Sequence, residues 1–294
     1  MSIVAITSLT RAAPPGDSHG AVHLLDLEGG RAARVLDWRR PDIDFSGARG
    51  GRGFSGLACL GDTAWASSGD ELFAFSPAFE LLEVYRNPYL EAARGVYAHD
   101  GELYVVSSAL DAVLRFDPAE GRFTWGLQLV DDDAGLRGVP FDPGATTGPS
   151  RSSALKLDSV FADARGLFVA GALSLGLLYF DGRGIHRPVT LPEGATDARP
   201  WADGVLFNDH DAGAARFLTP SHNRVFAAPV DPAADGNPHP GGLAVIGPNR
   251  FVSGTTPLTV CVHNVETMQT EQRYILSEDP NETITAITPW PFKN

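Results

Sequence analysis

Four acidic or imidazole side chains lie beside short β-rich runs, where they could hold a metal ion or move protons. They are Asp158, Asp203, His239 and Glu282. Carboxylate and imidazole groups are ligands for Ca²⁺, Mg²⁺, Mn²⁺ and Zn²⁺, and a neutral imidazole suits proton transfer near pH 7. We expect His239, Asp203 and Asp158 as catalytic candidates and all four as candidate ligands of one divalent metal, with no other cofactor. The alternative is that these carboxylates cap turns or form surface ion pairs and that His239 is a solvated loop residue.

A second group of side chains suits the binding of a small anionic substrate. Arg52 and Arg94 each precede a glycine at the start of a β-rich run, and two guanidinium groups at one site would bind a carboxylate or phosphate ester. Ser55 could add a hydroxyl group, while Tyr97 and Trp201 could form an aromatic wall. The structural alternative is that each arginine pairs with an aspartate of a neighbouring unit and that the aromatic rings pack in the core.

Two motif matches lack the context that their chemistry needs. Residues 51–56 read Gly-Arg-Gly-Phe-Ser-Gly and satisfy the dinucleotide pattern G-x-G-x-x-G, but strands rather than a helix follow them. Ser55 lacks the G-x-S-x-G elbow of serine hydrolases. His99 and His210 lie in the short turns HDG and HDAG, and we expect both on the face opposite the candidate site.

An internal repeat positions these residues. Apolar runs broken by turn residues such as Gly, Asp and Asn recur with a period of roughly 40 to 45 residues, typical of β-propellers. The units begin at Gly53, Arg94, Lys156, Trp201 and Gly241. A fourth strand follows most units, so each unit predicts a blade of four antiparallel strands. The starts of the innermost strands would then surround a central channel, with any metal on its axis.

The two ends of the sequence supply a sixth blade. Residues 282–292 read as a lone innermost strand, and the first 38 residues contain three strands that lack one. Pairing them would close the ring and cover two sheet edges. The sequence therefore predicts an all-β, six-bladed β-propeller that occupies residues 1–294 as a single domain.

One interval of the repeat is too long. It contains residues 131–153, which are rich in Asp, Gly, Pro and Ser and lie between the last strand of one blade and the first of the next. We expect an inserted loop over one face of the ring. Two alternatives stay open for it, a lid over the channel or an unstructured insertion.

Composition narrows the possible partners and compartment. A formal net charge of −13 opposes binding to nucleic acid or to anionic membrane surfaces. Cys59 and Cys261 lie in apolar runs and are expected as buried, reduced thiols. The sequence shows neither a signal-peptide pattern nor an apolar run long enough to span a membrane, so we expect a cytoplasmic protein.

The phrases RGVYAHDGELYVVSSALDAVLRFDP from Arg94 and WADGVLFND from Trp201 resemble the superfamily of six-bladed propellers that contains gluconolactonases and strictosidine-synthase-like proteins. In its lactonase branch, acidic and amide residues at the starts of innermost strands hold an axial divalent metal. Asp203 is similar to that pattern. Residues 53–56 replace the expected glutamate, and no blade start offers the expected asparagine, so the resemblance implies the fold more firmly than the metal.

These observations predict a small-molecule enzyme, a hydrolase, lyase or isomerase, that acts on an anionic metabolite at the channel mouth, with or without a metal. The alternative is a non-catalytic propeller that uses the same face to bind a protein or a ligand.

Overall fold

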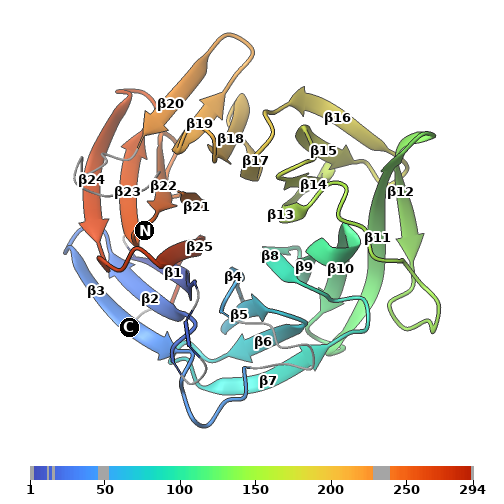
Figure 1. Cartoon of the computed structure of the whole chain (residues 1–294), viewed down its shortest axis with the longest axis horizontal. Coiled ribbons are helices and arrows are strands. Elements are labelled where there is room, and N and C mark those ends of the chain that lie inside the picture. The colour runs from blue at the N-terminus through green and yellow to red at the C-terminus, as the bar shows by residue number, and fades with distance from the viewer. Residues whose placement is uncertain (1–2, 12, 15–16, 46–52, 228–238, 293–294) are drawn as a thin grey trace.

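The protein folds as a ring of six antiparallel β-sheets around a central opening (Figure 1). The computed structural model describes residues 3–11, 13–14, 17–45, 53–227 and 239–292. Among these residues the only helix is one 3-10 turn, η1 (Ser108–Leu110). No helix in this part of the chain is long and apolar enough to cross a membrane. The predicted all-β, six-bladed architecture is confirmed.

Three blades form the first half of the ring, and their strands follow one another from the innermost strand outward. Blade 1 consists of β25 (Glu282–Pro289), β1 (Ile3–Thr10), β2 (Ala21–Asp26) and β3 (Arg31–Asp37). Blade 2 consists of β4 (Gly56–Leu60), β5 (Thr63–Ser68), β6 (Glu71–Phe75) and β7 (Leu81–Arg86). Blade 3 has five strands, β8 (Ala93–His99), β9 (Glu102–Ser107), β10 (Ala112–Asp117), β11 (Arg122–Asp132) and β12 (Gly135–Phe141).

The other three blades have four strands each. Blade 4 consists of β13 (Leu157–Asp163), β14 (Gly166–Gly171), β15 (Gly176–Phe180) and β16 (Ile185–Thr190). Blade 5 consists of β17 (Ala195–Trp201), β18 (Gly204–Asp209), β19 (Ala214–Leu218) and β20 (Asn223–Ala227). Blade 6 consists of β21 (Pro240–Val245), β22 (Arg250–Thr255), β23 (Thr259–Asn264) and β24 (Gln269–Ile275).

The position of a strand within its blade determines its sequence pattern. Every residue of β6, with the sequence ELFAF, is buried because neighbouring blades cover both faces of this strand, the third from the axis in blade 2. The outer strand β24, with the sequence QTEQRYI, alternates exposed and partly buried residues because one of its faces meets solvent. The buried apolar side chains accordingly form six clusters, one at each seam between neighbouring blades.

The ring closes between the two ends of the described chain. Strand β25 pairs antiparallel with β1, with Ile284 opposite Ser8, and beyond β25 the Trp290 backbone N–H donates to the Ile3 carbonyl oxygen at 3.0 Å. Figure 1 shows the red β25 on the inner side of the blue β1. The predicted pairing of the last strand with the first is confirmed.

The long interval between blades 3 and 4 is more regular than the expected loop over residues 131–153. Strand β12 forms a hairpin with β11 at the outer edge of blade 3. After it, the chain is tied to blade 3 and to the segment that enters it: the Tyr89 hydroxyl donates to the Ala145 carbonyl oxygen, and Ser152 Oγ donates to Asp111. No residue of 131–153 lines the pocket described below.

The start of blade 5 differs from the predicted position. The sequence places the first strand of this blade at Trp201, but Trp201 ends β17, and the apolar run GVLFND is the second strand, β18. The true first strand, ATDARPW, contains Asp, Arg and Pro and therefore resembles a loop. A strand that lines a channel can carry such residues because its side chains need not enter an apolar core.

Candidate functional site

The six innermost strands begin at one face of the ring, which we call the mouth. On five of them, β8, β13, β17, β21 and β25, the pairing with the next strand is interrupted by a β-bulge close to the mouth. The interruptions leave Arg94, Asp158, Asp197, Gly242 and Thr285 outside the regular pairing. Bulges turn a side chain away from the sheet and are frequent beside active sites. Here they supply the polar residues at the channel mouth.

Two bulge carboxylates connect three successive blades. Asp158 Oδ1 accepts a hydrogen bond from the Asp197 backbone N–H at 3.1 Å, and Asp197 Oδ2 accepts from the Gly242 backbone N–H at 2.9 Å. Asn208 Nδ2 also donates to Asp197 Oδ2 at 2.9 Å. The second oxygen of Asp158, Oδ2, is buried and has no hydrogen-bond partner within the described chain. One carboxylate oxygen is thus left for a proton or for a ligand.

Burial and mutual repulsion favour the protonated forms of this pair. Burial, followed by the negative charge of Asp197, raises the pKa of Asp158 to about 8, whereas Arg94 acts in the opposite direction. Burial also raises the pKa of Asp197, opposed first by Arg199. Because the two carboxyl groups interact, their titration belongs to the pair. At neutral pH we expect at least one proton on it.

Two imidazole groups lie at the same mouth. His210 follows β18 and its Nε2 lies 3.0 Å from Thr196 Oγ1, and its ring centroid lies 6.2 Å from that of His239, which precedes β21. Burial lowers the pKa of His210 below its usual value, so the ring is neutral at pH 7. Together these groups border a cavity of about 290 Å³ whose lining includes Ser55, Arg94, Asp158, Thr196, Asp197, His210, His239 and Arg11.

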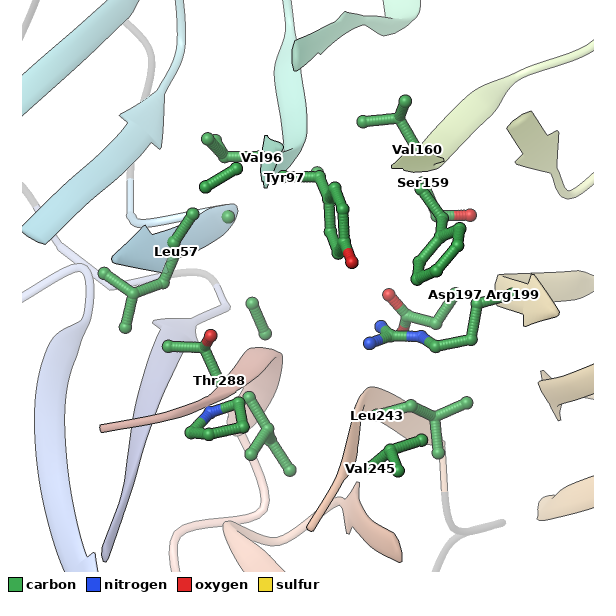
Figure 2. Close-up of a pocket in the computed structure, with 18 of the residues that line it drawn as sticks. Leu57, Val96, Tyr97, Ser159, Val160, Asp197, Arg199, Leu243, Val245 and Thr288 are labelled. Carbon is green, nitrogen blue, oxygen red and sulfur yellow. The ribbon is translucent and has the colours of Figure 1, made fainter. Parts of the chain in front are cut away.

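Below the mouth the cavity adjoins an axial channel of about 390 Å³, and Ser55, Asp197 and Thr285 line both spaces. The channel wall is mainly apolar. Figure 2 shows Leu57, Val96, Val160, Leu243 and Val245 around it. In the same view, the Tyr97 hydroxyl group and the Arg199 guanidinium group are directed into the channel (Figure 2).

The residues expected to bind or transform a substrate are distributed along this channel. Ser55, Arg94, Asp158 and His239 lie together at the mouth. Tyr97 and Trp201 line the channel beyond it, where Tyr97 packs against Phe161 with ring centroids 4.7 Å apart. Arg52 lies outside the described residues.

Asp203 is not part of the mouth, contrary to the expectation. It is exposed in the turn between β17 and β18, at the far end of blade 5, beside a separate groove. The displacement follows from the misplaced start of blade 5: a residue expected near the beginning of the inner strand comes after its end. The bulge aspartate of blade 5 is Asp197.

Glu282 also lies away from the axis. The His23 imidazole at 3.8 Å and the Ser8 hydroxyl group, which donates at 2.9 Å, hold the Glu282 carboxylate within blade 1 and lower its pKa to about 2. Of the four candidate metal ligands, only Asp158 and His239 therefore share the mouth. No three His, Cys, Asp or Glu side chains of the described residues are close enough together to hold a metal ion. Within the described part of the chain, the residues therefore do not fit the expected axial metal.

Sequence reasoning missed Asp197, Arg199 and His210. Asp197 and Arg199 belong to the strand that was read as a loop. His210 was expected on the opposite face because HDAG was placed after a first strand; it follows the second strand, which returns the chain to the mouth. The blade spacing offered no clue, because a start at Trp201 gives intervals of 45 and 40 residues from Lys156 and to Gly241, whereas a start at Ala195 gives 39 and 46.

No family model matches the chain, and no curated protein matches its sequence. Similar solved structures include a protein of unknown function from Bacteroides caccae, with a TM-score of 0.62, 12% identity and coverage of 98% of this chain and 99% of that chain. A chain of a nidogen/laminin complex has a TM-score of 0.59 at 14% identity and covers 97% of both chains. A streptogramin B lyase has a TM-score of 0.54 at 11% identity, with coverage of 80% of this chain and 85% of that chain. At these identities the likeness shows the fold alone. The chain is a six-bladed β-propeller, and its structural neighbours include a streptogramin B lyase and a chain of a nidogen/laminin complex.

Proposed function

We propose that the mouth is the active site of an enzyme that transfers protons on a small anionic metabolite, as a lyase or an isomerase. The observation that carries the proposal is the meeting of a carboxyl group with a free, buried oxygen and a neutral imidazole in one cavity. An acid and a base whose environments move their pKa values in opposite directions can both act at neutral pH. The resemblance to gluconolactonase-like and strictosidine-synthase-like propellers agrees with a small-molecule site at this end.

The proposed roles follow from position. Asp158, protonated on Oδ2, donates its proton to the leaving group or to the carbon that is reprotonated. His210, held by Thr196, takes a proton from a carbon atom of the substrate, and His239 forms the facing wall. Arg94 and Arg11 give the mouth a positive potential that attracts an anion despite the negative net charge of the chain.

The competing function is that of a non-catalytic binding module. It is favoured by a specific observation: both mouth carboxylates accept backbone hydrogen bonds from the next blade, which is also what a purely structural link would do. The likeness to a chain of a nidogen/laminin complex supports the same alternative.

Proton exchange in D₂O separates the two functions. The protein is incubated with a panel of small hydroxy acids and unsaturated carboxylic acids, and loss of carbon-bound hydrogen is followed by NMR. We expect catalysed exchange, with a loss of at least 100-fold in Asp158→Asn and in His210→Gln. Asp203→Asn makes the same chemical change at the far end of blade 5 and should retain full exchange. Absence of exchange in the unaltered protein, or exchange that persists in both mouth variants, would favour the binding module.

A further inference from the structure

Among the described residues, Arg199 is the only arginine or lysine that lines the channel below the mouth. The first inner-strand residues to resume pairing after the bulges are Val96 on β8, Ser159 on β13, Leu243 on β21 and Ala286 on β25. On β17 the corresponding residue is Arg199. Its long side chain enters a ring whose other members are apolar or small, and Figure 2 shows its guanidinium group in the open space.

The Arg199 guanidinium group has no hydrogen bond or ion pair to the described residues, although Asp197 and Tyr97 are close enough to act on it electrostatically. Burial lowers the pKa of Arg199, because the channel wall removes water without replacing its hydrogen bonds. Fully buried arginines are almost always paired, whereas Arg199 is partly buried and open to the channel. A guanidinium group left open in an apolar cavity therefore has capacity for an anion.

Tyr97 adds a second donor beside it. The Tyr97 ring packs on Phe161, which fixes the ring, and its hydroxyl group points into the same space as Arg199 (Figure 2). A carboxylate accepts two hydrogen bonds from one guanidinium group and a further one from a phenol. The apolar wall formed by Leu57, Val96 and Leu243 favours a carbon skeleton over a second charge.

We propose that Arg199 and Tyr97 form a carboxylate subsite inside the channel and that the substrate is a short organic acid whose carbon skeleton extends toward the mouth. A β-strand rises about 3.3 Å per residue, so the subsite lies one or two residues below the Asp158 level, or about 3 to 7 Å. That distance corresponds to a reacting carbon a few bonds from the carboxylate. The subsite deepens the proposed proton-transfer function, and only the assignment of the reacting carbon rests on that function.

Hexanoate and its uncharged analogue hexanamide test the subsite directly by isothermal titration calorimetry. We expect hexanoate to bind the unaltered protein at least tenfold more tightly than hexanamide. Arg199→Met keeps the length of the side chain and should abolish this preference, whereas Tyr97→Phe should reduce hexanoate binding several-fold and leave hexanamide unchanged. Arg122→Met makes the same change at an exposed arginine on β11, away from the channel, and should retain the preference.

Several outcomes would overturn the subsite. They are equal binding of the two probes, absence of hexanoate binding up to about 10 mM, and a preference that survives Arg199→Met or is lost in Arg122→Met. Thermal melting checks folding, and Arg199→Met should melt no lower than the unaltered protein, since it removes an unpaired, desolvated charge. If Arg199→Met does not fold, Tyr97→Phe decides the question.

Asp158→Asn should bind hexanoate with unchanged affinity. If the unaltered protein binds hexanoate at this subsite but catalyses no proton exchange, the proposed function is refuted and the subsite is not. Proton exchange that persists in Arg199→Met with an unchanged KM would refute the subsite alone.

Discussion

Asp158 combines a structural role with the chemical role that we propose for it. Its Oδ1 holds the backbone of the neighbouring blade while Oδ2 is free. Asparagine can replace the first role because its carbonyl oxygen also accepts a hydrogen bond, but it cannot exchange a proton. Asp158→Asn therefore separates the hydrogen bond to the neighbouring blade from the proposed proton transfer.

The pH dependence of stability should reveal the proton on Asp158. Its folded-state pKa of about 8 exceeds the unfolded value of about 3.9. Below about pH 4, Asp158 is protonated in both the folded and the unfolded protein. Between about pH 4 and 8 it is ionised in the unfolded chain but still protonated in the folded protein, so this group lowers the free energy of unfolding as pH rises. Asp158→Asn should gain stability relative to the unaltered protein across this range, by on the order of a few kcal/mol at pH 8.

Urea unfolding at several pH values measures this gain. Asp203→Asn is the matched control, since it makes the same change at an exposed aspartate at the far end of blade 5, and its difference from the unaltered protein should stay within about 0.5 kcal/mol. A constant difference for Asp158→Asn would show that Asp158 ionises normally in the folded protein.

The pH dependence of catalysis tests the proposed acid, Asp158, and the proposed base, His210. The acid must be protonated, so we expect kcat/KM to fall above about pH 8 as Asp158 ionises. The base must be neutral, and because the pKa of His210 lies below its usual value, the rate should persist below pH 6.5. A rate that rises between pH 6 and 9 would contradict this assignment of acid and base.

At the scale of elements, the inner strands approach one another where they begin, and glycine permits that approach. A Cβ atom on Gly241 of β21 would lie 2.1 Å from the Ile284 carbonyl oxygen of β25. Gly241→Ala should therefore reduce the free energy of unfolding by about 2–3 kcal/mol, because backbone must move to make room. Gly247→Ala is the control, since nothing lies within 4 Å of its added Cβ, and we expect a change within about 0.5 kcal/mol. Equal urea midpoints for the two variants would contradict the close packing at the mouth.

Apolar periodicity predicted the architecture well because most strands of a propeller face other blades. It also placed the beginnings of three inner strands at Arg94, Lys156 and Gly241, each within one residue of the observed start. It failed at β17, where the strand faces the channel and contains Asp197, Arg199 and Pro200. The bulges were not predictable from that pattern, since they depend on how neighbouring inner strands meet.

At the scale of the whole molecule, the last strand holds the ring together through both of its seams. Ile284 and Ile287 belong to the cluster between blades 6 and 1, while Trp290 belongs to the cluster between blades 1 and 2. Trp290 is 2% exposed and stacks on Phe79, with ring centroids 5.1 Å apart and an interplanar angle of 9°. The ring is thus closed by side-chain packing as well as by strand pairing.

Trp290→Ala should therefore weaken the ring at its closure. Removing a buried tryptophan costs about 3–5 kcal/mol, and the loss should act first at the seam between blades 1 and 2, because the Trp290 side chain packs there against Phe79. Hydrogen exchange should show faster exchange in β1 and β25 than in β13 to β16, together with a lower urea midpoint. Leu82→Ala is the control: Leu82 is 55% exposed on the outer strand β7, and its loss should change stability by no more than about 0.5 kcal/mol. Equal acceleration of exchange in all six blades of Trp290→Ala would contradict this prediction. It would show that β1 and β25 separate only when the whole ring unfolds.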